Sequence, residues 1–175
     1  GPSSVNVENA HLVDKELFEK GIPVLGICYG MQLTTHLLGG KVKKGEKGEY
    51  GKAKFEIQKS NTLLSGVSRF STVWMSHFDE VETVPAGFNI NGMTDVISAI
   101  SDESRNIYCV QFHPEVSHTE EGARMIDNFV FNICKAPKNW KLTNYIDKTV
   151  AEIKEKVGDQ KVILGLSGGV DSSVA

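Results

Sequence analysis

The sequence predicts an α/β fold in which a doubly wound, mixed sheet carries helices on both faces. Three observations support this prediction. Residues 24–27 form a short apolar strand that passes through a glycine-flanked turn into a helix. Residues 107–112 form a second apolar strand, which ends in the polar sequence His-Pro-Glu. Apolar residues at i, i+3, i+4, i+7 and i+8 over residues 126–134 predict an amphipathic helix. We expect the strand over residues 24–27 near the middle of the sheet.

The other elements follow from changes of apolar pattern along the chain. Gly39 and Gly40 end the helix that begins at Gly30. Residues 43–51 are polar and rich in glycine, which predicts a loop. The expected elements, in order, are a short helix over residues 12–18, the strand over 24–27, the helix over 30–38, strands over 53–57, 73–75, 96–100 and 107–112, and a turn over 102–106.

A second, incomplete domain is expected after a polar linker over residues 135–139. Thr143 is predicted to cap a helix that ends at Gly158, and residues 161–166 predict a strand. So short a segment cannot bury a core of its own, so we expect it to be the start of a larger domain. The first domain is also expected to be truncated, because a doubly wound sheet normally has βαβ units before such a strand. The expected domains are residues 1–139 and residues 140–175.

Composition excludes several classes of partner. The chain has 175 residues and a net charge of −3, and 40% of its residues are hydrophobic. The lysines around residues 41–44 are followed at once by Glu46 and Glu49, so no nucleic acid or membrane partner is expected. Its 3 cysteines are an odd number without paired or zinc-ligand spacing, which predicts a reducing, cytoplasmic location and no metal site in the first domain.

Cys28 is the candidate nucleophile, because it lies where the strand meets the helix, between Gly26 and Gly30. This is the cysteine form of the nucleophile elbow, a sharp turn that exposes the reactive atom. Glycine neighbours are expected there, since a Cβ would crowd a residue held in a strained conformation. The N-terminus of the following helix directs its dipole at the sulfur, which favours the thiolate. The plainer alternative is a buried core cysteine, which is also the expectation for Cys109 and Cys134.

A cysteine nucleophile needs a base, and His113 is the candidate. It follows the strand over residues 107–112, at the kind of strand end where α/β enzymes place reactive groups. Glu115 lies two residues further on, so in extended backbone its carboxylate can hold the imidazole. His77, which follows the strand over residues 73–75, is the competing base. Taken alone, His-x-Glu also fits a surface loop of unrelated charges.

A glycine and hydroxyl loop follows the predicted strand over residues 161–166, where a further helix is expected to begin. Its backbone N–H groups and hydroxyls can surround a phosphate, aided by the helix dipole. It lacks the lysine of the Walker loop, and a glycine-rich turn is the plainer alternative. Asp171 either holds Mg²⁺ or caps the helix. The candidate ATP-binding residues are Ser167, Gly168, Gly169, Val170, Asp171, Ser172 and Ser173.

The cysteine turn and the downstream Phe112-His113-Pro114-Glu115 resemble the motifs of the class I, or triad, glutamine amidotransferases. The loop over residues 167–172 resembles that of the N-type ATP pyrophosphatases. In tandem, and with Trp74-Met75-Ser76-His77 between the first two motifs, they resemble the glutamine-hydrolysing GMP synthase family over essentially the whole chain. The resemblance implies a flavodoxin-like, doubly wound amidotransferase domain, truncated at its N-terminus, followed by the first helix and strand of an ATP pyrophosphatase domain.

The resemblance also implies residue roles. Cys28 would attack the side-chain amide of glutamine to form a glutamyl thioester, with His113 as base and then acid and Glu115 as its orienting group. The backbone N–H groups of Tyr29 and Gly1 would stabilise the oxyanion. The positions that line the glutamine site in relatives are Gln32, Ser76, Phe78 and Asp79.

For the second domain, the resemblance implies that ATP and Mg²⁺ adenylate xanthosine monophosphate (XMP), and that ammonia from glutamine displaces AMP to give GMP. Glutamine, ATP and XMP are therefore the expected partners, and the full-length protein is expected to be a homodimer. Two alternatives stay open. A stand-alone cysteine hydrolase of γ-glutamyl or peptide bonds would explain the cysteine and histidine but not the second loop. A non-catalytic amidotransferase-like subunit would be indicated by an altered nucleophile or base, and both are present here.

Overall fold

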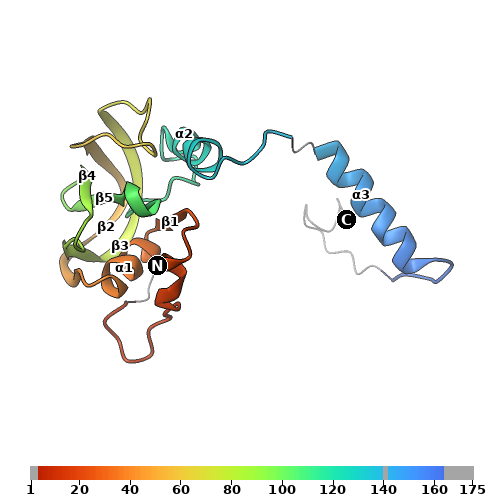
Figure 1. Cartoon of the computed structure of the whole chain (residues 1–175), viewed down its shortest axis with the longest axis horizontal. Coiled ribbons are helices and arrows are strands. Elements are labelled where there is room, and N and C mark those ends of the chain that lie inside the picture. Colours follow the sequence, from red (N-terminus) through yellow and green to blue (C-terminus); the bar gives the residue numbers. More distant parts are fainter. Residues whose placement is uncertain (1–3, 140–141, 164–175) are drawn as a thin grey trace. The chain divides into compact units, whose positions relative to one another are not determined.

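The computed structural model describes residues 4–139 and 142–163, and the chain divides into two compact units, Gly1–Ala136 and Pro137–Ala175 (Figure 1). The assignment of these units to an amidotransferase and a pyrophosphatase domain stays a prediction. Gly1 and the loop over residues 167–173 lie outside the described residues.

The first unit contains one 6-stranded mixed sheet with the strand order β1-β6-β5-β4-β2-β3. Strand β1 (Val24–Ile27) pairs in parallel with β6 (Ile107–Val110), and the other pairs are antiparallel. Within the described residues β1 is therefore an edge strand, and its expected place near the middle of the sheet is wrong. Strands β2 to β5 all lie on the side of β6 away from β1. No described strand therefore pairs with the other side of β1.

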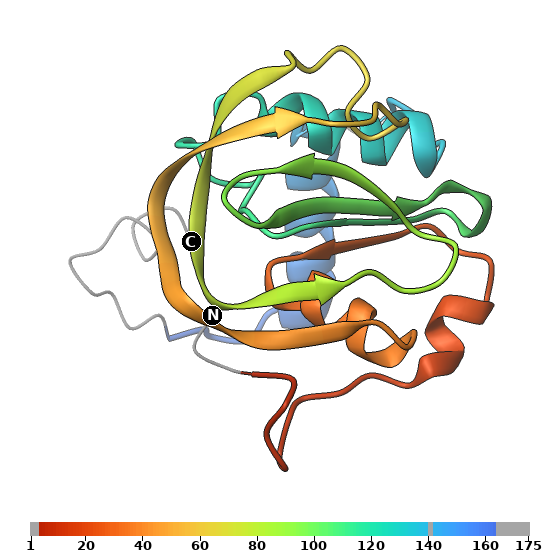
Figure 2. The same cartoon turned by 90° about the vertical axis from the view of Figure 1, so that its left-hand side faces the viewer.

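The long hairpin of β2 (Lys41–Ile57) and β3 (Phe70–Thr83) corrects the loop predicted over residues 43–51. Two glycines in this segment reflect close backbone approach rather than a loop. A Cβ on Gly45 would lie 2.3 Å from the carbonyl oxygen of Phe78, and one on Gly48 would lie 3.0 Å from that of His77. Figure 2 shows both strands bending strongly along their length.

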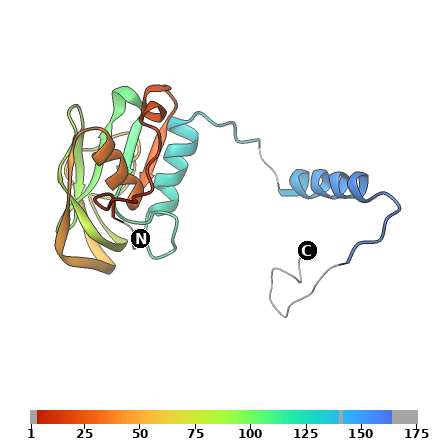
Figure 3. The same cartoon turned by 90° about the horizontal axis from the view of Figure 1, so that it is seen from below.

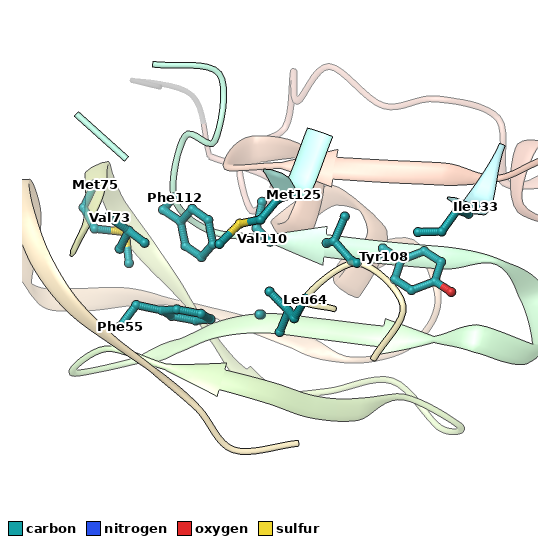
Figure 4. Packing of buried hydrophobic residues seen from close by; sticks show 11 residues of the cluster. Phe55, Leu64, Val73, Met75, Tyr108, Val110, Phe112, Met125 and Ile133 are labelled. Atoms are coloured by element: carbon teal, nitrogen blue, oxygen red, sulfur yellow. The ribbon is translucent and has the colours of Figure 1, made fainter. Parts of the chain in front are cut away.

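Side chains that alternate along β6 face two separate cores, as the pleat of a strand requires. Tyr108 and Val110 join a cluster that includes Met125 and Ile133 (Figure 4). Ile107 and Cys109 join a second cluster with Met31 on the opposite face. The first cluster is covered by α2 (Gly122–Asp127) and the π-helical η3 (Asn128–Ile133), and the second by α1 (Tyr29–Leu37) (Figure 3). This arrangement confirms helices on both faces of the sheet.

The remaining predicted elements are present, but their boundaries differ: the strand predicted over residues 73–75 is part of the longer β3, and the strand predicted over residues 107–112 ends at Val110. The helix expected over residues 126–134 is the α2–η3 pair, and the turn expected over residues 102–106 is a short 3-10 helix. Strand β4 was not predicted, because its sequence Asn-Ile-Asn-Gly-Met has little apolar character. The elements whose bounds have not yet been given are η1 (Lys15–Glu19), β4 (Asn89–Met93), β5 (Ile97–Asp102) and η2 (Glu103–Arg105).

The second unit contains α3 (Leu142–Val157), which ends at Gly158 in the left-handed conformation with φ 55°, as predicted. The helix begins at Leu142, so Thr143 lies inside it and is not its N-cap. Residues 161–163 are not part of a strand, and the rest of the strand predicted over residues 161–166 lies outside the described residues. No helix in the described part of the chain is long and apolar enough to cross a membrane.

Candidate active site

Cys28 occupies a strained turn between β1 and α1, as the glycine pattern predicted. Its backbone has φ 53° and ψ −106°, a conformation that non-glycine residues rarely adopt. Its N–H donates to the carbonyl of Val110 at 2.8 Å, which continues the β1–β6 ladder into the turn. A Cβ on Gly26 would lie 2.8 Å from the carbonyl oxygen of Gly30 and cannot be accommodated. A Cβ on Gly30 would meet nothing within 4 Å, so the steric requirement applies to Gly26 alone.

The Cys28 side chain is 4% exposed and lies among polar groups. Its thiol donates to the carbonyl oxygen of Ser76 at 3.6 Å. Its sulfur also accepts a hydrogen bond from Nε2 of Gln111 at 3.7 Å. Polar neighbours of this kind distinguish Cys28 from a cysteine packed only against apolar side chains.

Cys109 and Cys134 have different surroundings. Cys109 is fully buried, and burial raises its pKa to about 12, so it stays a thiol. Cys134 was expected in the core but is exposed, because it follows the last turn of η3. Burial of part of its surface still raises the pKa of Cys134.

Cys28 and His113 follow two adjacent parallel strands, so both lie on the side of the sheet where those strands have their carboxyl ends. The parallel register pairs Ile27 with Val110, so both residues come after the carboxyl ends of β1 and β6. The Nδ1 atom of His113 lies 2.6 Å from Oε1 of Glu115. When Nδ1 donates this hydrogen bond, Nε2 is the basic nitrogen of the neutral ring. The structure thus brings His113 and Glu115 together as the sequence predicted.

Thr119 holds the backbone of His113 against β3, a relationship that sequence reasoning missed. Its hydroxyl donates to the carbonyl of His113 at 2.6 Å and accepts from the N–H of Trp74 at 3.1 Å. The N–H of His113 donates in turn to the carbonyl of Trp74 at 3.0 Å. The His118 ring stacks on the Trp74 indole with ring centroids 4.4 Å apart. These contacts attach the loop after β6 to a distant strand.

His77, the competing base, is 2% exposed and its ring contacts the Glu49 carboxylate. Its Nδ1 lies 3.0 Å from the carbonyl oxygen of Asp79, and its Nε2 lies 3.0 Å from Oε2 of Glu49. Burial raises the pKa of Glu49, but hydrogen bonds from His77 and Thr94 outweigh it and hold that pKa below its usual range. Because acceptors engage both ring nitrogens, His77 has a structural role here.

The four residues expected to line a glutamine site are placed differently. Gln32 is buried, and its Nε2 donates to the carbonyl of Asp79 at 2.8 Å. The Asp79 side chain is also buried, and among the described residues its Oδ2 has no hydrogen-bond partner. Ser76 faces Cys28 through its carbonyl. Phe78 is 39% exposed, with the Lys44 ammonium 5.5 Å from its ring centroid.

Tyr29 is the first residue of α1 and directly follows Cys28, so its N–H belongs to the unpaired first turn of that helix. The second predicted oxyanion donor, Gly1, lies outside the described residues. Within the described ranges, no cluster of three or more His, Cys, Asp or Glu side chains is placed to hold a metal ion.

Comparison with known proteins gives a consistent result. Residues 1–133 match the family Glutamine amidotransferase class-I. Over its whole length the chain is 51% identical to a glutamine-hydrolysing GMP synthase of Clostridium botulinum and 51% identical to one of Brachyspira hyodysenteriae. It covers 34% of each, so the chain spans about a third of the length of these curated relatives.

A solved structure supports the same relationship. A Thermoplasma acidophilum protein described as one subunit of a GMP synthase is 32% identical, with a TM-score of 0.66, over 77% of this chain and 65% of that one. The family match spans the unit that holds the cysteine turn and His113, and the chain belongs to the class I glutamine amidotransferases.

Proposed function

We propose that the first unit hydrolyses glutamine to glutamate and ammonia with Cys28, His113 and Glu115. The observation that carries this proposal is the strained turn at Cys28 beside β6, a strand that is followed by the hydrogen-bonded His113–Glu115 pair. A nucleophile, a base and an orienting carboxylate are the groups that covalent amide hydrolysis requires. The relatives at 51% identity are glutamine-hydrolysing enzymes, which supports the same substrate.

In the acylation step, Nε2 of His113 takes the thiol proton and the sulfur attacks the side-chain amide carbon of glutamine. The backbone N–H of Tyr29 stabilises the oxyanion, and by resemblance the N–H of Gly1 does so too. His113 then returns the proton to nitrogen, the C–N bond breaks, and ammonia leaves a glutamyl thioester. In deacylation, His113 removes a proton from water, the hydroxyl adds to the thioester carbon, and glutamate leaves as the thiol is restored.

We propose that Asp79 binds the α-ammonium group of glutamine. Asp79 is 9% exposed, and in the described part of the chain its Oδ2 lacks a hydrogen-bond partner. A buried carboxylate oxygen without a partner is costly unless a ligand satisfies it. Gln32 supports the position of Asp79 through the hydrogen bond to its carbonyl. Ser76 and Phe78, on the same strand, complete the proposed glutamine site.

For the full-length protein we propose glutamine-dependent synthesis of GMP from XMP and ATP. The support is the identity of about half of all residues with GMP synthases over the whole chain. The proposed ATP loop, residues 167–173, lies outside the described residues, and a role for Mg²⁺ there rests on the resemblance. A cytoplasmic, homodimeric enzyme remains the expectation. A stand-alone cysteine hydrolase or a non-catalytic subunit is not favoured, because neither accounts for these relatives.

The test uses the full-length protein with either glutamine or ammonium as the nitrogen source. Cys28→Ala should abolish GMP formation from glutamine and leave formation from ammonium, because the two sites are separate. Cys134→Ser, an exposed thiol, is the matched control and should keep both activities. Glutamine-dependent activity retained by Cys28→Ala would refute the proposal.

The proposed ATP loop has its own test. Gly168→Val or Gly169→Val should block synthesis from both nitrogen sources, because a side chain would fill the space of a phosphate. A glutamine-analogue alkylator should still label Cys28 in these variants. Normal synthesis from ammonium would show that the loop is only a turn.

A further inference from the structure

We infer that Gln111 is a further catalytic residue, whose side-chain amide donates a hydrogen bond to the Cys28 sulfur and stabilises the thiolate. The inference deepens the proposed function and rests on Cys28 being the nucleophile. It stands on the contact between Nε2 of Gln111 and Sγ of Cys28 at 3.7 Å, within the range of hydrogen bonds to sulfur.

The sheet places Gln111 beside the nucleophile. Gln111 follows β6 directly, and its N–H donates to the carbonyl of Ser98 at 2.9 Å, which extends the pairing with β5. In the parallel pairing of β1 with β6, Ile27 lies opposite Val110. The next residues, Cys28 after β1 and Gln111 after β6, therefore lie beside each other. Gln111 is fully buried, at 0% exposure, so its amide cannot turn into solvent.

A chain of hydrogen bonds determines which end of the Gln111 amide faces the sulfur. The Oε1 atom of Gln111 accepts from Nε2 of Gln32 at 3.2 Å. That same Nε2 donates to the carbonyl of Asp79 at 2.8 Å. The Asp79 carbonyl can only accept, so the NH₂ group of Gln32 must face it, and the amide atom of Gln111 that faces this same NH₂ group must be the oxygen. Gln111 therefore presents its oxygen to Gln32 and its NH₂ group to Cys28.

The far end of this chain is also held in place. The Asp79 carbonyl faces Nδ1 of His77 at 3.0 Å, and His77 pairs with Glu49. The network thus joins α1, β2, β3 and the residue after β6 through buried groups. A rigid donor of this kind costs no reorganisation when charge develops on its acceptor.

The Gln111 amide favours the thiolate over the thiol, because a hydrogen bond to a charged acceptor is stronger than one to a neutral acceptor. The carbonyl of Ser76, 3.6 Å from the sulfur, acts in the opposite direction because it accepts from the S–H group. Cys28 is 4% exposed, so solvent supplies little stabilisation of the charge. Gln111 gives up no proton in this role: the thiol proton goes to His113, and the amide stays intact.

The test measures the rate of Cys28 alkylation by iodoacetamide against pH in the full-length protein, with Cys134→Ser as background. This rate follows the thiolate fraction, so it reports on the sulfur without requiring glutamine turnover. Gln111→Leu, similar in size but without a donor, should lower the rate at pH 7 about tenfold and move the profile to higher pH. Gln111→Glu should lower it further, because a carboxylate repels the thiolate.

Asn128→Leu is the matched control for loss of a buried amide. Nδ2 of Asn128 donates to the carbonyls of Leu63 and Ser65, outside the network of Gln111. It should reduce stability without moving the alkylation profile. Gln111→Asn, one methylene shorter, provides a second variant that withdraws the donor if Gln111→Leu does not fold.

The outcomes separate this inference from the proposed function. An alkylation profile of Gln111→Leu or Gln111→Asn that coincides with the parent would overturn the role of Gln111, while loss of glutaminase in Cys28→Ala would still uphold the nucleophile. Glutaminase retained by Cys28→Ala would instead overturn the proposed function. A profile moved to higher pH by all three Gln111 variants and not by Asn128→Leu would support the inference.

Discussion

The Nδ1 atom of His113 lies 2.6 Å from Oε1 of Glu115 across a single proline. Pro114 restricts the backbone between the two residues, so the pair is set by local geometry. The backbone of His113 is held separately, by Thr119 and by the carbonyl of Trp74. The ring and the backbone of this histidine therefore depend on different parts of the chain, and they can be tested separately.

His113→Ala should lower the glutaminase kcat by about 10²–10⁴-fold, the usual contribution of a general acid–base residue. Glu115→Gln should cost less, because an amide oxygen can still accept from Nδ1. His77→Ala should act mainly on stability, since it removes the hydrogen bonds of the His77 ring with Asp79 and Glu49. Steady-state kinetics and urea unfolding of the three variants provide the comparison. A larger loss of Cys28 alkylation in His77→Ala than in His113→Ala would show that the base was wrongly assigned.

Thr119→Val should lower kcat about tenfold with little change in KM, because it removes the two hydroxyl hydrogen bonds that help to hold His113 against β3. Thr119→Ser keeps the hydroxyl and should retain most of the activity. Kinetics of both variants distinguish the hydroxyl from the methyl group. A loss in Thr119→Ser without a loss in Thr119→Val would indicate that the methyl group of Thr119 matters for packing and that its hydroxyl does not.

Gly26→Ala should destabilise the fold and slow Cys28 alkylation, because the new Cβ would lie 2.8 Å from a backbone oxygen and 2.9 Å from the sulfur of Cys109. Gly30→Ala is the matched control. Its Cβ meets open space inside α1, and alanine favours helix, so stability should stay the same or rise by up to about 1 kcal/mol. Thermal unfolding of both variants tests this contrast, and a similar loss in each would contradict the steric role of Gly26.

Stability should fall in acid through Glu49, whose pKa the hydrogen bonds of His77 and Thr94 hold below its usual range. A carboxyl with a lowered folded-state pKa stabilises the protein above its unfolded pKa, about 4.3 for glutamate, and loses this effect as pH falls through the folded value. The difference in unfolding free energy between the parent and Glu49→Gln should therefore be large at pH 7 and shrink below about pH 4.

Glu56→Gln is the control for this pH experiment, because Glu56 forms an exposed ion pair with Arg69 and should have little effect at either pH. Urea titrations at the two pH values give the comparison. A pH-independent difference for Glu49→Gln would show that the Glu49–His77 contact contributes through packing alone.

The sequence by itself determined the features that depend on neighbouring residues. The turn at Cys28 was predictable because Gly26 and a strand-to-helix change of pattern encode a local backbone conformation. The His113–Glu115 pair was predictable because alternate residues of extended backbone point to one side. Helices on both faces of the sheet were predictable from the apolar patterns of the strands and of residues 126–134.

Only the tertiary structure decided the features that join distant segments. Residues 43–51 form a strand because β3 supplies hydrogen-bond partners, and no local pattern marks a polar segment that pairs this way. Gln32, Gln111 and Asp79 meet through contacts spanning 79 and 47 residues of sequence. His77 and His113 each follow a strand predicted from the sequence and look alike there, although the structure places His77 inside β3. The two histidines differ in the structure because His77 is buried against Glu49. The sequence does not show this difference, since the solvation of a side chain depends on every element packed around it.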